Sequence, residues 1–490
     1  MMNKKILAVA VAGAIAAPGL ALAQATTSGT NVQVYGLFDQ AVRQDRYSNS
    51  VAVGQGNLTK WHMHNGAPNR LGFRGTEALG DGMSAFFQVE SQVFMDARVD
   101  NASGPATNAT VGGRPTFMGL RAGWGEVSIG YQESAYKDVY AATWQVGPTQ
   151  PHFGTIMGMG NTTGQIPGPA AGATAATCAG GQASGIGTAG ITAVATATPS
   201  ASTAPAAGAG TPLCGTEAVG NGTSFNRTLS DTIQFRSPVF AGFRYSTQMA
   251  IAELKENPTQ PTATTGINGA TGYSQYKPSY GSHSLTWSGG PFSLAAGYEV
   301  HTGFRAINTP YTNRNAKDTA ISLGARWNYG KGLLAAGWER LKYGDSSGNG
   351  ASGAAATTSN NFNIVNWTVQ GTYDLTAADT AAIGYSKTPG AKNCGNAFSA
   401  TTGVFAGPAG TAGNAACGTA GSANMITLSL DHRFSKRTAL YAQYSRINNG
   451  SGSNYYYIAG PTTNTGLGVS GALSAGTDVS TYGVGMKHTF

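Results

Sequence analysis

Two arginines alternate with apolar residues in the segment NRLGFRGTE, residues 69–77. Arg70 and Arg74 share one parity, while Leu71 and Phe73 share the other. A period of two predicts a β-strand whose two faces meet different surroundings. Guanidinium groups are permanently charged and bind anions. The polar face of this strand would therefore attract anions, and the apolar face needs a lipid or a protein core.

The composition explains both faces. Hydrophobic residues make up 41% of the chain and charged residues only 11%, and there are 71 glycines. About 25% of residues are charged in a typical soluble protein. After the N-terminal segment, no run reaches the ~18–20 apolar residues of a spanning helix. We therefore expect a membrane β-barrel, in which lipid-facing apolar residues alternate with polar residues that face the lumen.

The formal net charge is +8, and removal of Lys4 and Lys5 with a signal peptide leaves +6. Basic chains often bind nucleic acid, but here no basic cluster is interleaved with aromatic residues. The charge is spread along strands instead, which suits a pore that prefers anions.

Little in the chain suggests catalysis. The seven histidines are scattered, and neither an HExxH nor a GxSxG motif occurs. No CxxC or histidine cluster suggests a metal. We expect a protein that is not an enzyme and uses no cofactor. The alternative is an outer-membrane hydrolase, with carboxylates or a Ser-His pair at the rim of the barrel.

The N-terminus has the pattern of a secretory signal. Lys4 and Lys5 precede the apolar run Ile6 to Leu22, and Ala21-Leu22-Ala23 is a small-x-small cleavage site. We expect residues 1–23 to be a signal peptide and residues 24–490 to form the barrel. The alternative is a transmembrane anchor, for which the run is too short.

The C-terminal residues also alternate. Residues 482–490 place Tyr482, Val484 and Met486 on one face with His488 and Phe490. This pattern predicts a strand with an apolar face, and it resembles the final-strand signal of outer-membrane barrels. His488 departs from that face. The alternative is an edge strand of a soluble sheet.

Short turns and long polar loops separate about sixteen predicted strands, as in transmembrane barrels. Residues 49–67 are expected to be a polar loop. The strands are predicted at residues 32–42, 69–77, 83–95, 114–122, 126–131, 227–238, 240–249, 280–287, 292–301, 319–329, 333–343, 362–373, 380–387, 424–434, 439–447 and 481–490.

Two segments, NRLGFRGTEALGDGMSAFFQVES and RPTFMGLRAGWGEVSIG, resemble the general-diffusion trimeric porins of Gram-negative outer membranes. Residues 32–131, 227–245, 435–441 and the terminal strand carry the resemblance. It implies a 16-stranded antiparallel transmembrane β-barrel, a homotrimer, and lipid of the outer membrane around it. The pore would pass small hydrophilic solutes and ions.

The resemblance also implies a lumenal cluster of Arg70, Arg114 and Arg227. Parity opposes two of them, because Arg114 and Arg227 share the parity of apolar residues. A bulge, or a position just ahead of the strand, would resolve the conflict. Arg74 and Arg236 have the polar parity without such help.

In that family, the long loop after the fifth strand folds inward and narrows the pore. Here it would span residues 132–226. Its Pro151-His152-Phe153-Gly154 resembles the family's Pro-Glu-Phe-Gly, so His152 replaces an acid. Asp138 and Glu133 remain as candidate acids opposite the arginines. Opposed charges would set a transverse field across the narrow part of the pore.

Residues 161–223 are mostly Ala, Gly, Thr and Pro and form a low-complexity insert in this loop. The insert could leave the lumen or plug part of it. Four cysteines allow three pairings. We favour two local disulfides, Cys178 with Cys214 and Cys394 with Cys417, and free thiols are the alternative.

The sequence thus predicts an outer-membrane porin for passive diffusion, with a preference for anions. Two alternatives stay open. One is a substrate-specific channel with a ladder of arginines or aromatic residues in its lumen. The other is a barrel that acts mainly as a surface adhesin or structural protein through its long loops.

Overall fold

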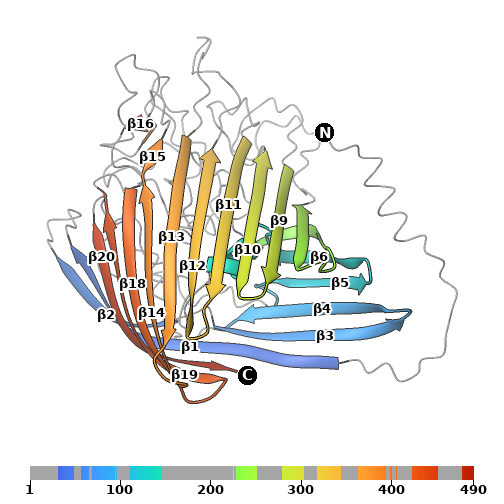
Figure 1. The fold of residues 1–490 in the computed structure, drawn as a ribbon, viewed down its shortest axis with the longest axis horizontal. Coiled ribbons are helices and arrows are strands. Elements are labelled where there is room, and N and C mark those ends of the chain that lie inside the picture. The colour runs from blue at the N-terminus through green and yellow to red at the C-terminus, as the bar shows by residue number, and fades with distance from the viewer. Residues whose placement is uncertain are drawn as a thin grey trace, which may run out of the picture.

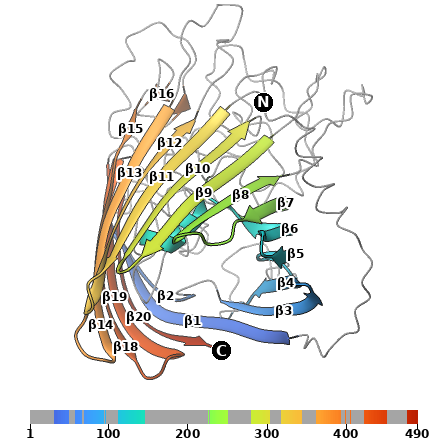
Figure 2. The ribbon, with the colours of Figure 1, turned by 45° about the vertical axis from the view of Figure 1, so that its right-hand side comes forward.

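The structure of the chain is a computed structural model. It describes residues 31–48, 57–65, 69–93, 95, 111–144, 225, 228–250, 279–302, 317–343, 362–392, 398–399, 404–405, 422–450 and 477–490. Antiparallel strands dominate these residues, and they curve into one closed wall (Figures 1 and 2).

The elements follow the chain in this order: β1 (Asn31–Ser48), β2 (Leu58–Asn65), β3 (Arg70–Gly80), β4 (Met83–Gln92), β5 (Thr116–Ala122), β6 (Gly125–Glu133), α2 (Lys137–Val139), the π-helical turn η2 (Tyr140–Trp144), β7 (Thr228–Arg236), β8 (Phe243–Ala250), β9 (Ser279–Gly289), β10 (Phe292–Thr302), β11 (Lys317–Asn328), β12 (Gly332–Tyr343), β13 (Phe362–Asp374), β14 (Asp379–Pro389), β15 (Ala391–Lys392), β16 (Phe398–Ser399), β17 (Val404–Phe405), β18 (Ser422–Arg433), β19 (Thr438–Asn449) and β20 (Asp478–Thr489).

The first strand closes the barrel. Residues of β1 pair with β3 in the register Val34↔Phe73 and with β20 in the register Val42↔Val484. The main sheet has 18 strand segments. Since β2 continues β3 along β1, and β15 continues β14 along β13, sixteen strands form the wall. The predicted 16-stranded antiparallel barrel is confirmed.

One predicted loop is partly wrong. Residues 49–67 were expected to be a polar loop, but Leu58–Asn65 form β2 and pair with β1. Trp61 and Met63 point outward from it, with 64% and 55% of their surface exposed. Two apolar residues in a polar segment only weakly predict a strand. Here, backbone pairing with the long strand β1 stabilises the extended conformation.

The two faces of the wall differ as the alternation predicts. On β1, Val42 is 52% exposed on the outside, whereas its neighbours Arg43 and Asp45 are buried on the lumenal side. Phe73 is also exposed on the outer face. Apolar residues therefore face outward and polar residues inward, as a barrel in lipid requires.

The C-terminal strand has the predicted faces. Tyr482, Val484 and Met486 are exposed on the outside of β20. His488 follows the same parity, and its Nδ1 lies 2.9 Å from the hydroxyl of Thr438. The Phe490 ring lies over Gly36 of β1, so the last residue helps to close the barrel seam.

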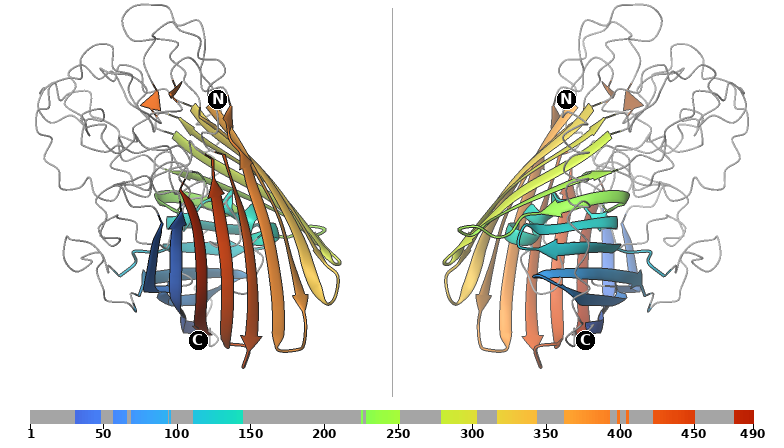
Figure 3. Two further views of the ribbon diagram at one scale, coloured as in Figure 1. Left: turned by 90° about the vertical axis from the view of Figure 1, so that its left-hand side faces the viewer. Right: turned by 90° about the vertical axis from the view of Figure 1, so that its right-hand side faces the viewer.

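Short turns join the strands at one end of the barrel (Figure 3), and at the opposite end longer stretches of sequence separate consecutive strands. The turn Gly80-Asp81-Gly82 between β3 and β4 is one of the short turns, with φ values of 92°, 49° and 73°. Glycine adopts such positive φ values at little cost. In the part of the chain that the structure describes, no helix is long and apolar enough to cross a membrane.

Candidate functional site

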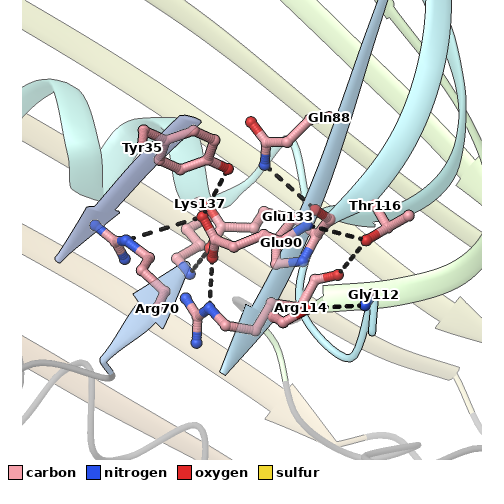
Figure 4. A network of polar contacts seen from close by, with 11 residues as sticks. Tyr35, Arg70, Gln88, Glu90, Gly112, Arg114, Thr116, Glu133 and Lys137 are labelled. Atoms are coloured by element: carbon pink, nitrogen blue, oxygen red, sulfur yellow. Dashed lines mark hydrogen bonds and ion pairs between the residues drawn. The ribbon is translucent and has the colours of Figure 1, made fainter. Parts of the chain in front are cut away.

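A network of polar groups on the lumenal face is centred on Glu90 (Figure 4). Glu90 of β4 lies opposite Gly72 of β3, and Gly72 lies opposite Tyr35 of β1. A Cβ at position 72 would lie 2.4 Å from Cζ of Tyr35, so glycine leaves space for that ring. The Tyr35 hydroxyl therefore reaches across β3 and donates to Glu90 Oε2 at 3.0 Å.

Two predicted arginines converge on the same carboxylate. Arg70 Nε lies 3.8 Å from Glu90 Oε2, and Arg114 Nε donates to Glu90 Oε1. The Glu90 side chain is only 8% exposed, whereas the Arg70 side chain is 35% exposed. The open side of this network thus presents guanidinium charge, and the carboxylate lies beneath it.

Arg114 reaches the lumen because it lies outside the strand. Alternation within a strand would place it with Met118, which is 61% exposed on the outer face. However, β5 begins only at Thr116, and the Arg114 N–H donates to the Glu90 carbonyl at 3.1 Å. Pro115 has no N–H to continue the ladder. The break in alternation turns the side chain inward.

The end of β6 and the segment that follows it add further charges to the lumenal face. Glu133 forms an ion pair with Lys137, one helical turn later, beside the Glu90 network (Figure 4). Asp138 Oδ1 lies 3.5 Å from Nη2 of Arg236 on β7. Asp138 Oδ2 also accepts a hydrogen bond from Ser284 of β9 at 3.2 Å. Asp138 thus joins the loop to two strands of the wall.

The same segment packs against the lumenal face of β9–β12. Glycines on this face accommodate it. A Cβ at Gly324 would lie 1.9 Å from Thr143 Oγ1, and one at Gly337 would lie 2.1 Å from Trp144 Cε3. Arg326 Nε donates to the Thr143 carbonyl at 3.1 Å. Thr143 and Trp144 are therefore buried in a groove that larger wall residues would fill.

Tyr136 anchors the start of this segment. Its N–H donates to Ser282 Oγ at 2.8 Å, and its hydroxyl donates to Glu339 Oε2 at 3.4 Å. Ser282 in turn donates to Glu299 Oε2 at 2.9 Å. Burial raises the pKa of Tyr136 well above its usual value, so the hydroxyl stays protonated and remains a donor. Both glutamates are buried beneath the segment.

The remaining predicted residues divide into two groups. Arg74 lies on the lumenal face, where its guanidinium stacks over the Tyr35 ring at 5.0 Å and donates to Gln33 Oε1 at 2.9 Å. The others lie outside the described residues: Arg227, His152, Cys178, Cys214, Cys394 and Cys417.

Sequence reasoning missed three members of the site. Glu90 alternates with Gln88 and Gln92 on the polar parity of the strand predicted at residues 83–95, but no role is predicted for it. That parity was the available signal, because an acid among amides on a lumenal face is the natural partner for nearby arginines. Tyr35 and Lys137 gave no comparable signal, since their contacts depend on strand pairing and on the path of the loop.

The chemistry of this site is electrostatic. Among the residues that the structure describes, no three His, Cys, Asp or Glu side chains come close enough to hold a metal ion. The groups that do converge are guanidinium, ammonium and carboxylate groups on a lumenal surface. Such groups change the local concentration of ions of each sign.

A sequence model described as "Gram-negative porin" matches residues 8–452. The chain belongs to the Gram-negative porin family. Membership places this porin in the outer membrane of a Gram-negative cell.

Curated relatives match a shorter part of the porin. The "Major outer membrane protein P.IB" of Neisseria meningitidis is 31% identical over 140 residues, which cover 28% of this chain and 36% of the relative. "Outer membrane porin protein 32" of Delftia acidovorans is 33% identical over 153 residues, which cover 30% of this chain and 38% of the relative. The match thus spans little more than a third of each relative.

Among solved structures, the fold is similar to the "Anion-selective porin from Comamonas acidovorans". The TM-score is 0.54 at 19% sequence identity, and the alignment covers 94% of this chain and 100% of that one. At this identity the likeness concerns the fold.

Proposed function

We propose that this porin forms a water-filled channel in the outer membrane, through which small hydrophilic solutes and ions diffuse with a preference for anions. One observation carries the proposal. Around the inward-folded segment, the lumenal side carries six cations (Arg70, Arg74, Arg114, Lys137, Arg236 and Arg326) and five acids, which are Glu90, Glu133, Asp138 and the buried Glu299 and Glu339 beneath Tyr136. The balance is positive, and it agrees with the basic composition of the chain.

Exposure keeps the imbalance in the same direction, because more cations than acids are partly exposed. Arg70, Lys137 and Arg236 keep 35%, 29% and 32% of their side chains exposed. The acids Glu133, Asp138 and Glu90 keep 42%, 27% and 8%. Two further acids of the lumenal wall, Glu299 and Glu339, are buried. An ion in the lumen would therefore meet more exposed cationic than anionic charge, which raises the local anion concentration.

The test is the conductance of the purified protein in a planar bilayer with a salt gradient. We expect large open steps and a reversal potential that favours anions. Anion preference should weaken in the double variant Arg70→Ala/Arg114→Ala. Open steps with cation preference would refute the role of the arginines but not the pore. No conductance from a folded barrel would refute the channel itself.

We extend the proposal to the processing and assembly of the chain. Residues 1–23 act as a signal peptide, and residues 24–490 form the mature barrel. Three barrels assemble into a homotrimer. Mass spectrometry of the mature N-terminus and of the intact assembly in mild detergent would test both points; a retained N-terminus or a monomer would refute them.

The long loop would span residues 132–226, with the low-complexity insert at 161–223. Disulfides Cys178–Cys214 and Cys394–Cys417 would each close one local loop, which an oxidising compartment permits. Peptide mapping without reduction would identify these links, and free thiols or crossed links would contradict them. In this proposal, Arg227 and His152 also face the constriction.

A further inference from the structure

Four cations lie on the outer face of neighbouring strands, near the end of the barrel opposite the short turns. They are Lys317 of β11, Arg340 and Lys342 of β12, and Lys387 of β14, which we call the basic patch. Their strands run side by side to that end of the barrel (Figure 1). None of the four takes part in the lumenal network.

Strand register fixes the side on which these residues lie. Arg340 lies opposite Ile321, which is 42% exposed on the outer face. Lys342 and Lys317 share the parities of Arg340 and Ile321 on their own strands. Lys387 lies opposite Trp367, whose strand exposes Val369 by 52% on the same face. All four cations therefore project from the face that meets the membrane.

Among the described residues, no acid forms an ion pair with any of the four members of the basic patch. Arg446 on the outer face of β19 gives a contrast, because its Nη2 lies 3.5 Å from Asp478 and its Nε donates to Asn448 at 2.6 Å. The charge of Arg446 is thus already satisfied.

Aromatic residues place the patch at the depth of lipid headgroups. Trp338 lies opposite Trp367 on the outer face, and the rings of Trp367 and Tyr385 are 5.5 Å apart. Such aromatic residues occupy the interfaces of transmembrane barrels. Arg340 and Lys342 lie beyond this row, toward the strand end, whereas Lys387 lies in the row itself, opposite Trp367. There, a cation on the lipid face costs only about 0–1 kcal/mol.

We propose that the basic patch binds the phosphate-bearing headgroup of a lipid in the outer leaflet. Clusters of Lys and Arg at a membrane boundary recognise anionic headgroups. Short turns mark the periplasmic end of such barrels, so the opposite end, where the patch lies, faces the outer leaflet. Guanidinium and ammonium groups suit phosphate oxygens, and the aromatic row would contact the acyl chains below.

The test uses the intact porin in phosphatidylcholine nanodiscs that contain a small fraction of lipid A with two phosphates. After gel filtration in mild detergent, intact-mass spectrometry counts the lipid A molecules retained by each barrel. The triple variant Arg340→Gln/Lys342→Gln/Lys387→Gln should lower the affinity for lipid A by about 10- to 100-fold. Its single-channel conductance should not change, because these residues face outward, and this readout also verifies folding.

Two matched controls separate the patch from charge in general. Lys331→Gln/Lys436→Gln removes exposed cations at the short-turn end, and Arg446→Gln removes a cation that is already paired; both should retain lipid A. Dephosphorylated lipid A should not be retained by the natural porin. Equal loss in the controls, no loss in the triple variant, or full displacement by millimolar inorganic phosphate would each overturn the proposal. A change in subunit number without lipid would instead assign the patch to a protein contact.

Discussion

Replacement of Glu90 and of Arg70 by glutamine should shift ion selectivity in opposite directions. Both residues belong to one network, and Arg70 Nε lies 3.8 Å from Glu90 Oε2. Glutamine at position 90 has nearly the same size and keeps one acceptor oxygen for either Tyr35 or Arg114, so the shape of the site should persist while the charge is removed. General damage to the network would shift the ion selectivity of both variants in the same direction. A change in charge must shift the two selectivities in opposite directions.

The size of the shift follows from the charge that is removed. An ion that passes about 7 Å from one unit charge in water interacts with it by about 0.6 kcal/mol, and screening at 0.1 M salt lowers this to about 0.3 kcal/mol. Loss of the Glu90 charge would favour an anion and disfavour a cation by that amount each. The anion-to-cation permeability ratio should therefore rise about threefold in Glu90→Gln and fall about threefold in Arg70→Gln.

The assay is the reversal potential of single barrels in a planar bilayer, measured with a tenfold salt gradient near 0.1 M and again near 1 M. The effect should nearly disappear at the higher salt, where the Debye length is about 3 Å. Heat-modified gel mobility controls for folding. Shifts of the same sign in the two variants, or equal shifts at both salt concentrations, would refute an electrostatic role for this network.

Four further outcomes follow from the structure. Gly324→Leu should displace the loop segment at a cost of about 1–3 kcal/mol from overpacking and raise the conductance. Gly483→Ala, where a Cβ meets no atom closer than 3.8 Å, should leave the conductance unchanged, and equal conductance in the two variants would contradict the packing argument. Asp138→Asn should raise the anion-to-cation ratio about two- to threefold by the same arithmetic, and an unchanged reversal potential would count against Asp138. Burial raises the pKa of Tyr136 in the folded protein, so the contribution of its hydroxyl to stability is complete below about pH 10 and is lost as the pH rises through the raised pKa. Sugar influx into proteoliposomes should therefore be constant from about pH 8 to about pH 10 and increase at higher pH. In Tyr136→Phe, which has no hydroxyl to ionise, the influx should not increase with pH. Phe490→Ala should lower the free energy of unfolding of the barrel by about 2 kcal/mol, because the Phe490 ring covers Gly36 and lies 5.2 Å from the ring of Phe38. An unchanged midpoint of urea-induced unfolding would show that the ring does not contribute to stability.

Alternation predicted the wall well because each strand meets lipid on one side and polar groups on the other. The faces of Arg70 and Phe73 follow from parity alone. Prediction failed where other interactions override that rule. Residues 58–65 form a strand through pairing with β1, although only Trp61 and Met63 are strongly apolar on its outer face. Arg114 faces the lumen against the alternation because β5 begins only at Thr116, after this residue.

The site was less predictable, since its contacts join segments that are distant in sequence. The pairing of Asp138 with Arg236 depends on the path of the loop, and no local pattern encodes that path. Gly324 and Gly337 did not identify their contacts either, because a glycine in a strand predicts only a bulge or the close approach of some other group. The structure identifies the approaching group as Thr143 at one position and Trp144 at the other.

Packing of the loop segment and selectivity are linked in this porin. Tyr136 lies over the wall where Glu299 and Glu339 are buried, and it binds Glu339 directly and Glu299 through Ser282. Arg70 and Arg236, beyond this contact, stay about one-third exposed. The segment therefore occupies space in the lumen and also hides two acids that would attract cations. If Gly324→Leu displaces it, conductance should rise and anion preference should fall together, because the same movement that widens the lumen exposes these carboxylates to water.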